Sequence, residues 1–358
     1  MQEADPQAVI TEEQPAISDE LAIRTAREHY GLEVSLRPLV SERDQNFLLQ
    51  TVEGPRYVLK IANSAEDPVV TDFQIEALLH IERAITENDI PIAAPRLLHT
   101  LSGDKSIVLE TPDGNYVTRV VSFIEGIPLG ERIASPALAR NMGGFLANLG
   151  RALAGFDHPG ARHSLLWDMQ RALELRPLIE HVPEAETAAA VAEALDDFEH
   201  YAVPVLPSLR RQVVHNDFNA DNIVIEASNE EKVAGVIDFG DMLEAPLIAD
   251  VAIGASYVRT TSGDPLALML EFVAAYHRVN PFARDELDIL FELIKARLSA
   301  SVVILDWRVS LRGEDDPYLQ KIIYDEASAR RVLRRLQEVP REHARRIFRE
   351  ACASVDQS

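Results

Sequence analysis

Residues 213–225 read Val-Val-His-Asn-Asp-Phe-Asn-Ala-Asp-Asn-Ile-Val-Ile, a polar loop between two apolar runs. The loop has the form H-x-D-x-x-x-x-N, in which His215, Asp217 and Asn222 hold the fixed positions. Sixteen residues after Asn222 comes Asp238, within a second segment that reads Val-Ile-Asp-Phe-Gly-Asp over 236–241. Each segment alone is weak evidence, because Asp and Asn are frequent in loops. The two together at this spacing, each flanked by strand-like residues, are much harder to obtain by chance.

Transfer of a phosphoryl group from a nucleotide to a hydroxyl gives a physical reason for this combination. An acidic side chain must lie beside the acceptor hydroxyl to orient it and take its proton, and Asp217 fits this role. One neutral oxygen ligand and one carboxylate must hold Mg²⁺ against the nucleotide phosphates, and Asn222 and Asp238 fit it. His215 is expected to brace the loop by hydrogen bonds, which is also the common structural role of such a histidine.

A second set of residues lies upstream. The apolar run Tyr57–Ile61 contains one lysine, Lys60, and a helix is predicted over residues 68–83 with Glu76 on it. A kinase needs a strand lysine for the nucleotide's α- and β-phosphates, paired to a glutamate on the adjacent helix. The alternative is a surface lysine at a strand end and an ordinary helix glutamate. Together with the downstream motif, the pattern favours the nucleotide-binding roles.

The loop that would cover the phosphates has no glycine. Residues 40–47 read Val-Ser-Glu-Arg-Asp-Gln-Asn-Phe, where protein kinases have G-x-G-x-x-G. Backbone N–H groups, with the side chains of Ser41 and Asn46, could still contact phosphate, and Arg43 could supply charge. The alternative is a plain polar turn. Further on, Ser122 and Ile124 flank the expected hinge, where a purine would bond to the backbone.

The order of elements predicts an α+β protein with two lobes, like that of a protein kinase. A polar, acidic and disordered leader is expected over 1–17, a β-rich nucleotide-binding lobe over 18–124, and a helical lobe with the catalytic loop, metal site and substrate pocket over 125–358. The helical patterns of the second lobe span 136–155, 184–201, 247–258, 266–279, 286–310 and 317–337, interrupted by strand-like runs at 212–214, 223–225 and 233–239.

Charge and composition narrow the range of partners. The 358 residues carry a net charge of −23, which disfavours nucleic acid and anionic membranes and tolerates a cationic substrate. The single cysteine excludes a disulfide framework and suits a reducing cytoplasm. No apolar run is long enough to span a bilayer, and no signal peptide is visible. A cytoplasmic protein of undetermined oligomeric state is expected.

The chain resembles the aminoglycoside phosphotransferase–choline kinase superfamily over roughly residues 20–310. Within it, the segments 36–47 and 58–63, with His158-Pro159 and Trp167-Asp168, are most similar to hydroxylysine kinases and to kinase-like domains fused to class III aminotransferases. The resemblance implies an alcohol-acceptor phosphotransferase (EC 2.7.1-type) that uses Mg²⁺ with ATP or GTP; hydroxylysine kinases are associated with GTP. The missing glycine-rich loop and A-P-E element argue against a protein kinase.

The implied acceptor is a cationic or zwitterionic compound with a hydroxyl, such as a hydroxy-amino acid or an amino alcohol. Carboxylates would bind its ammonium and an arginine its carboxylate. Candidate carboxylates are Asp241 and Glu244. Arg297 and Ser301 lie four residues apart, on one face of a helix. Trp307 could line the pocket, although large aromatic residues belong more often to the core.

Other functions stay open at this point. An aminoglycoside, choline, ethanolamine or homoserine kinase would fit the same motifs. A protein of another class, a pseudokinase that binds nucleotide as a regulatory module, is suggested by the glycine-free loop. Turnover tested beside nucleotide binding would separate this class from the enzymes.

Overall fold

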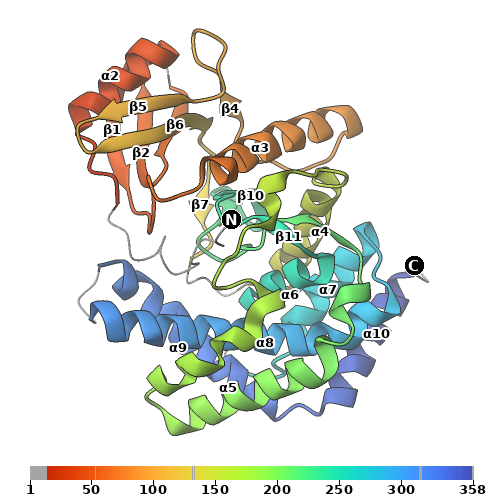
Figure 1. Cartoon of the computed structure of the whole chain (residues 1–358). Helices are drawn as coiled ribbons and strands as arrows, with labels where there is room; N and C mark the ends of the chain where they lie inside the picture. The colour runs from red at the N-terminus through yellow and green to blue at the C-terminus, as the bar shows by residue number, and fades with distance from the viewer. Residues whose placement is uncertain are drawn as a thin grey trace.

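The computed structural model describes residues 14–52, 54–130, 132, 134–260, 262–313 and 317–356, and these residues form two lobes (Figure 1). The smaller lobe is built on an antiparallel sheet with strand order β1-β2-β3-β6-β4, and β5 pairs with β6. Helix α2 packs against β1, and α3 packs against β4. The elements of this lobe are α2 (Asp19–Tyr30), β1 (Val34–Leu39), β2 (Gln45–Thr51), β3 (Arg56–Ile61), α3 (Pro68–Asn88), β4 (Leu97–Leu98), β5 (Ile107–Thr111) and β6 (Gly114–Ser122).

Helix α2 begins and ends where its sequence predicts. Ser18 is the N-cap and accepts a hydrogen bond from the Leu21 N–H, while Gly31 ends the helix at φ 68°. One prediction differs from the structure just before this helix: the disordered leader was expected to reach residue 17. Ile17 is buried, and its backbone exchanges two hydrogen bonds with the Gln45 side chain. Residues 1–13 of that leader lie outside the described residues.

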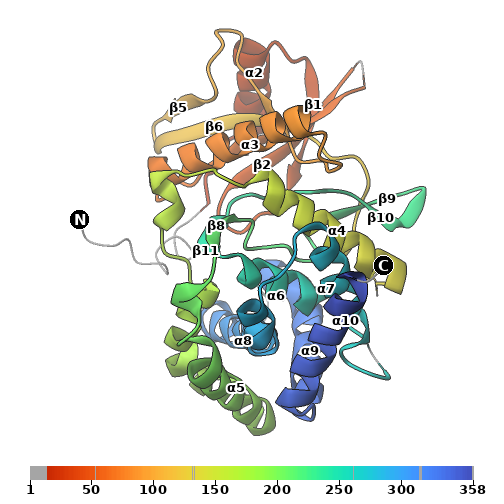
Figure 2. The same cartoon turned by 90° about the vertical axis from the view of Figure 1, so that its right-hand side faces the viewer.

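The lobes meet along two connections. Strand β7 (Ile127–Pro128) follows the hinge and pairs with β9 of the larger lobe. Gly126 precedes it with φ 149°, and a Cβ atom there would collide with the carbonyl oxygen of Ile225. Glycine is therefore required where the hinge crosses β9. On the other connection, α3 lies at the boundary in both views and packs against α4 and η1 (Figures 1 and 2).

The larger lobe is mainly helical and encloses two short groups of strands. One group has the order β10-β9-β7, and the other pairs β11 with β8. Helix α8 is buried along most of its length and contacts α5, α6, α9 and α10. The elements are α4 (Pro136–Ala152), η1 (Pro159–Arg162), η2 (Met169–His181), α5 (Ala185–Asp197), η3 (Phe198–Ala202), η4 (Leu206–Ser208), β8 (Arg211–Val214), β9 (Ile223–Glu226), β10 (Asn229–Val236), β11 (Leu243–Pro246), α6 (Leu247–Tyr257), α7 (Ala267–Val279), α8 (Arg284–Arg312), α9 (Pro317–Gln337) and α10 (Arg341–Asp356).

The predicted α+β architecture, with a β-rich first lobe and a helical second lobe, is confirmed. The helices depart from the prediction in several places. The helix expected over 184–201 ends as an α-helix at Asp197 and continues as the π-helical turn η3. Helix α10 was not predicted, although its buried residues Ala344, Phe348 and Cys352 recur every four positions.

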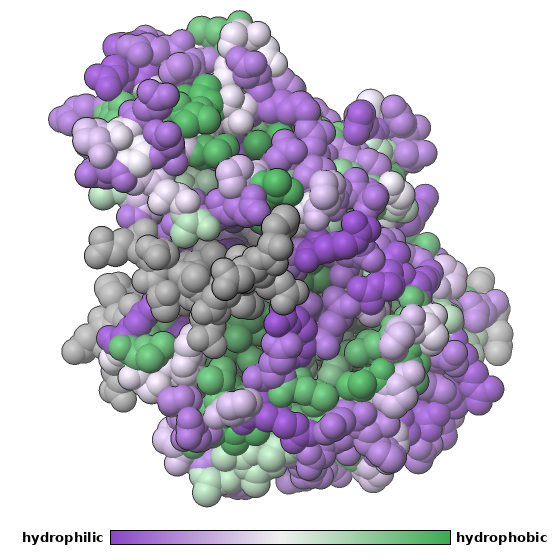
Figure 3. Space-filling view, in the orientation of Figure 1, coloured by the Kyte–Doolittle hydropathy of each residue, from purple (hydrophilic) through white to green (hydrophobic). Residues whose placement is uncertain are grey.

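The surface is largely hydrophilic on the face that Figure 3 shows, with smaller apolar areas over the helical lobe. In the part of the chain that the structure describes, every helix is too short or too polar to cross a bilayer.

Candidate active site

The H-x-D-x-x-x-x-N segment forms the loop that joins β8 to β9. Asp250, in the first turn of α6, fixes its start, because the backbone N–H groups of His215 and Asn216 donate to the Asp250 carboxylate at 3.3 and 2.8 Å. Asn216 takes φ 61°, a conformation that asparagine tolerates better than most residues. Burial raises the pKa of Asp250 to about 7, and the two N–H donors oppose this rise. The loop is thus anchored on a buried carboxyl group.

His215 braces the loop on its other side. Its Nε2 donates to the Ile237 carbonyl oxygen at 3.2 Å, and its Nδ1 accepts from the Asp217 N–H at 3.3 Å. Burial lowers the pKa of His215 to about 4, so the ring is neutral at pH 7. Both ring nitrogens of this neutral imidazole form hydrogen bonds with the backbone. His215 therefore positions other residues and is not available to transfer a proton.

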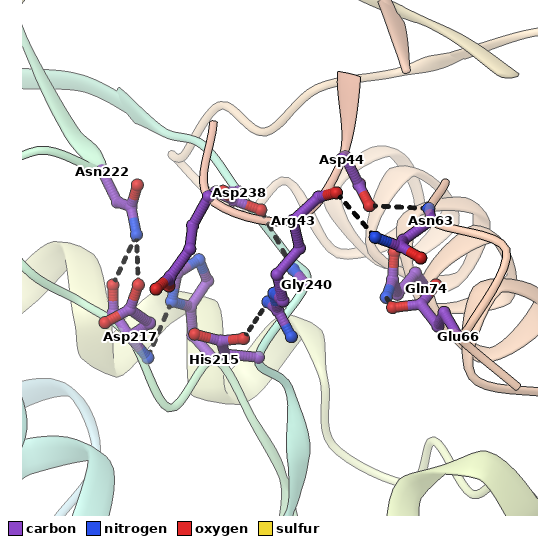
Figure 4. A network of polar contacts seen from close by, with 12 residues as sticks. Arg43, Asp44, Asn63, Glu66, Gln74, His215, Asp217, Asn222, Asp238 and Gly240 are labelled. Carbon is purple, nitrogen blue, oxygen red and sulfur yellow. Dashed lines mark hydrogen bonds and ion pairs between the residues drawn. The ribbon is translucent and has the colours of Figure 1, made fainter. Parts of the chain in front are cut away.

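Asp217 and Asn222 face each other within this loop (Figure 4). The Asn222 Nδ2 donates to the Asp217 carboxylate at 2.6 Å and to its backbone oxygen at 3.0 Å. This leaves the Asn222 side-chain oxygen as the atom that can ligate a cation. Arg297 of α8 reaches the other carboxylate oxygen of Asp217 at 3.4 Å. Burial, with the nearby charge of Asp241, raises the pKa of Asp217 to about 7 against the opposing charge of Arg297.

Asp238 lies beside this pair and follows β10. The Ile237 N–H donates to the Asn222 carbonyl oxygen at 2.9 Å, which joins the two motifs directly. Asp238 itself has φ 59° and accepts from the Gly240 N–H at 3.2 Å. Lys60 of β3 reaches its carboxylate at 3.3 Å across the lobes, and this charge holds the pKa of Asp238 well below its usual range. Asp238 is therefore ionised at neutral pH.

These oxygen atoms fit a magnesium site. An ionised carboxylate and an amide oxygen, with phosphates and water, make a set of ligands that Mg²⁺ accepts. The described residues hold no group of three or more His, Cys, Asp or Glu side chains that could bind a metal by themselves. A cation at Asn222 and Asp238 would accordingly depend on the nucleotide for part of its coordination.

The structure contradicts the expected pairing of Lys60 with Glu76. Glu76 forms its ion pair with Lys105, in the segment that precedes β5. The residue of α3 that faces the sheet is Gln74, which accepts from Arg119, the partner of Lys60 in the β3–β6 register. Glu76 follows Gln74 by two residues, which is a rotation of about 200° around the helix axis, so the two side chains point to different sides of α3.

Gln74 belongs to a buried polar network that sequence reasoning missed. Gln74 also donates to Glu66 at 3.3 Å (Figure 4). Thr71 donates to the same carboxylate at 2.6 Å. Burial and the charge of Asp44 raise the pKa of Glu66. The only sequence signal was the polar turn before the helix, which is common to any N-terminal cap.

We expect Glu76→Gln to leave kcat/KM within about two-fold, because half-exposed ion pairs contribute roughly 0–1 kcal/mol. Lys60→Met should lower kcat/KM about 10²-fold, as for the loss of a positioned phosphate contact. Steady-state kinetics of both variants at saturating Mg²⁺ measures the difference. Equal losses of kcat/KM in the two variants would instead support the predicted Lys60–Glu76 pairing.

The glycine-free loop between β1 and β2 is tied to the larger lobe. Arg43 forms an ion pair with Asp241 at 2.5 Å, so two of the predicted site residues hold each other. The Gln14 side chain donates a hydrogen bond to the Ser41 backbone carbonyl oxygen, so this contact does not involve the Ser41 hydroxyl. Asn46 lies opposite Lys60 in the β2–β3 register, and its buried side-chain oxygen has no partner among the described residues. Asn46 is thus placed beside Lys60.

At the hinge, Ser122 is engaged within its own lobe. Its N–H donates to the Arg96 carbonyl oxygen at 2.8 Å, and its hydroxyl accepts from the Arg96 N–H at 2.9 Å. The next N–H, that of Phe123, donates to Arg56. Ile124 lies against β10, where a Cβ on Gly235 would come within 2.9 Å of its side chain. The backbone N–H groups of Ser122 and Phe123 are therefore both engaged within the smaller lobe.

Of the residues predicted to bind the acceptor, some lie near Asp217 and others do not. Asp241 and Arg297 lie at the centre, and Tyr257 contacts Arg297 through its hydroxyl at 3.4 Å. Among the described residues, Glu244 forms its ion pairs with Arg162 at 3.0 Å and with Arg211 at 3.4 Å, and not with the central residues. The Ser301 hydroxyl donates to the Arg297 carbonyl oxygen within α8, and Trp307 is buried in the core.

The chain is similar to known proteins in sequence and in fold. The sequence pattern described as "Phosphotransferase enzyme family" matches residues 35–290. A hydroxylysine kinase of Xenopus laevis is 30% identical over 335 residues, which cover 87% of this chain and 88% of that protein. The fold is similar to an amicoumacin kinase in complex with AMP-PNP and Ca²⁺ (TM-score 0.65, 14% identity, 91% of this chain and 95% of that one). It is also similar to a microcompartment-associated aminopropanol kinase (TM-score 0.66, 17% identity, 87% and 95%).

Proposed function

Because the chain belongs to the phosphotransferase enzyme family and is a small-molecule kinase, we propose that it transfers the γ-phosphoryl group of ATP or GTP to the hydroxyl of a hydroxylysine-like hydroxy-amino acid or amino alcohol. Relatives named hydroxylysine kinase support this acceptor class, and the acidic surface suits a substrate with an ammonium group.

Asp217 is the proposed base. The acceptor oxygen forms a bond to the γ-phosphorus, the bond from that phosphorus to the β–γ bridging oxygen breaks, and the hydroxyl proton passes to the Asp217 carboxylate. Asn222 orients this carboxylate through its 2.6 Å hydrogen bond. Lys60 binds the α- and β-phosphates. Mg²⁺, held by Asn222 and Asp238, would neutralise charge on the β- and γ-phosphates when bound.

One observation carries the proposal. Two carboxylates of one site have pKa values displaced in opposite directions: that of Asp217 is raised to about 7, and that of Asp238 is lowered. Neighbouring groups with such divergent environments are typical of an acid–base residue beside a metal ligand.

The pH dependence of activity should follow Asp217. A base must be deprotonated to act, and burial raises the pKa of Asp217 to about 7. We therefore expect log kcat/KM for the acceptor to rise with a slope near one below pH 7 and to level off above it. The measurement uses constant ionic strength and saturating Mg²⁺-nucleotide. A profile flat from pH 5.5 to 8.5 would remove Asp217 as the base.

The decisive experiment is phosphoryl transfer to a panel of acceptors with both nucleotides. The panel contains hydroxylysine, homoserine, ethanolamine, choline, aminopropanol and an aminoglycoside, each with ATP and with GTP. We expect hydroxylysine to give the highest kcat/KM. Stabilisation by nucleotide without transfer to any acceptor would instead support a regulatory nucleotide-binding protein.

A further inference from the structure

Four side chains gather where the β1–β2 loop meets α8, and we call them the Trp167 cluster: Glu42, Arg43, Trp167 and Arg308. The guanidinium carbons of Arg43 and Arg308 lie 5.7 and 5.4 Å from the centre of the Trp167 ring. Glu42 reaches Arg308 at 3.1 Å, and the exposed fractions of these two side chains are 10% and 7%. The cluster is therefore a buried contact between the lobes.

The polar atoms of this cluster are incompletely paired. Among the described residues, Arg308 Nε and Nη2, Trp167 Nε1 and Glu42 Oε1 are buried and have no hydrogen-bond partner. The Glu42–Arg308 contact is thus an ion pair without hydrogen-bond geometry. A buried unpaired polar group costs roughly 1–3 kcal/mol, and more when it is charged, so native structures hold few of them. The cluster brings four such atoms to one place, which makes it a candidate for a ligand that satisfies them.

The unpaired atoms define the chemistry of that ligand. The donors of Arg308 and Trp167 require an anionic acceptor, and a planar carboxylate matches the guanidinium. The Glu42 oxygen requires a donor, and an ammonium supplies one. The Glu42–Arg308 pair is neutral overall, so the zwitterionic α-ammonium and α-carboxylate end of an amino acid can exchange partners with it without burying a net charge in the cluster.

The cluster is also linked to the proposed base through Arg43 and Asp241. Arg43 joins it to Asp241 at 2.5 Å, and Asp241 is close enough to raise the pKa of Asp217. On α8, Arg308 follows Arg297 by eleven residues, which is three helical turns, so both residues lie on one face. Arg297 contacts Asp217, where a substrate carboxylate would be repelled. The carboxylate beside Arg308 is that of Glu42, and an ammonium group of the same ligand would neutralise it.

We propose that Arg308 binds the α-carboxylate of the acceptor, with Trp167 Nε1 as a second donor and Glu42 as the partner of the α-ammonium. This inference rests on the proposed function and refines it: the acceptor is a hydroxy-amino acid with an intact zwitterionic group, and amino alcohols without a carboxylate are poor substrates. The hydroxyl lies toward Asp217 and the amino-acid group toward Trp167. Arg308 is then a specificity-determining residue.

The test compares hydroxylysine with the diamino alcohol that remains when its carboxylate is removed. Arg308→Gln should lower kcat/KM for hydroxylysine about 30- to 100-fold, mainly through KM, and change that for the diamino alcohol less than about three-fold. Because Arg308→Gln leaves Glu42 without its cation, the double variant Glu42→Gln/Arg308→Gln serves as a second test without a buried lone charge. It should show the same loss of preference for the carboxylate. Equal loss with both acceptors, or no loss with either, would overturn the inference.

Binding without nucleotide keeps this inference separate from the proposed function. Calorimetry measures hydroxylysine and the diamino alcohol against wild type and Arg308→Gln. If wild type transfers phosphate only to other acceptor classes, the proposed function fails, while calorimetry still decides the role of Arg308. Hydroxylysine binding equally to wild type and Arg308→Gln, or not binding to wild type, contradicts the inference.

Discussion

Asp217→Asn is expected to lower kcat about 10³- to 10⁴-fold, because a positioned general base contributes 10²–10⁴ and the amide cannot take the hydroxyl proton. The fold should survive, since the asparagine oxygen can still accept from Asn222, as the carboxylate does at 2.6 Å. The KM for nucleotide should change little. Rapid-quench and steady-state kinetics with both nucleotides measure these constants.

The same variant should be as stable as wild type or more stable at pH 8. The pKa of Asp217 is about 7 in the folded protein, above the usual value of 3.8. The folded state therefore binds the proton more tightly, and stability falls as the pH rises from about 4 to 7. Above that range the buried carboxylate opposes folding, and the neutral amide removes this cost.

Asp221→Asn is the matched control, because Asp221 is an exposed carboxylate of the same loop. Its kcat should stay within about two-fold of wild type, as for most surface substitutions. If Asp217→Asn retained more than a tenth of wild-type kcat, or if its melting temperature fell far below that of Asp221→Asn, the loss could not be assigned to the base.

Much of this site was predictable because its residues are close together in the sequence. Asp217 and Asn222 are five residues apart in one loop, so the loop itself sets their geometry. Asp238 follows the strand paired with β9, and hydrogen bonds between these neighbouring segments bring it beside Asn222. The apolar runs that flank both motifs define these strands in the sequence. The roles assigned to these residues stay predictions.

The partner of Lys60 could not be predicted, because it depends on how α3 is rotated. Glu76 and Gln74 are both polar residues on a half-buried helix, and the sequence does not show which one faces the sheet. The charge of Lys60 is balanced by Asp238, which is 178 residues away. Contacts of this range follow from the packing of the two lobes, which local patterns do not encode.

The contacts of the β1–β2 loop were missed for the same reason. Without glycine, the loop has side chains at every position, and Glu42 and Arg43 reach Arg308 and Asp241 in the other lobe. Arg308 stands in a long helix with many charged residues, and its burial is a property of the assembled lobes. Because this loop contains no glycine, its side chains can form contacts between the lobes.

Asp238→Asn should reduce kcat/KM at least about 10³-fold and raise the Mg²⁺ concentration needed for half-maximal activity about ten-fold or more. The amide is a weaker ligand for a hard cation and leaves Lys60 without the carboxylate that it reaches at 3.3 Å. A titration of activity with Mg²⁺ at fixed nucleotide measures the second effect. Excess Mg²⁺ should restore only part of the activity, because the carboxylate charge is lost as well.

The effect of this substitution on stability should be opposite in sign to that of Asp217→Asn. The pKa of Asp238 is lowered, chiefly by Lys60, so its ionised form stabilises the fold above pH 4, and this contribution is lost as the pH falls. About half of the side chain is exposed, so water screens the pair and the loss at pH 7 should stay below about 1 kcal/mol. Glu226→Gln, which breaks the Glu226–Lys232 ion pair of the adjacent hairpin, is the matched control and should keep full activity. An unchanged Mg²⁺ requirement in Asp238→Asn would show that the cation is bound elsewhere, because a lysine–carboxylate pair without a metal role predicts a loss of activity that Mg²⁺ does not relieve.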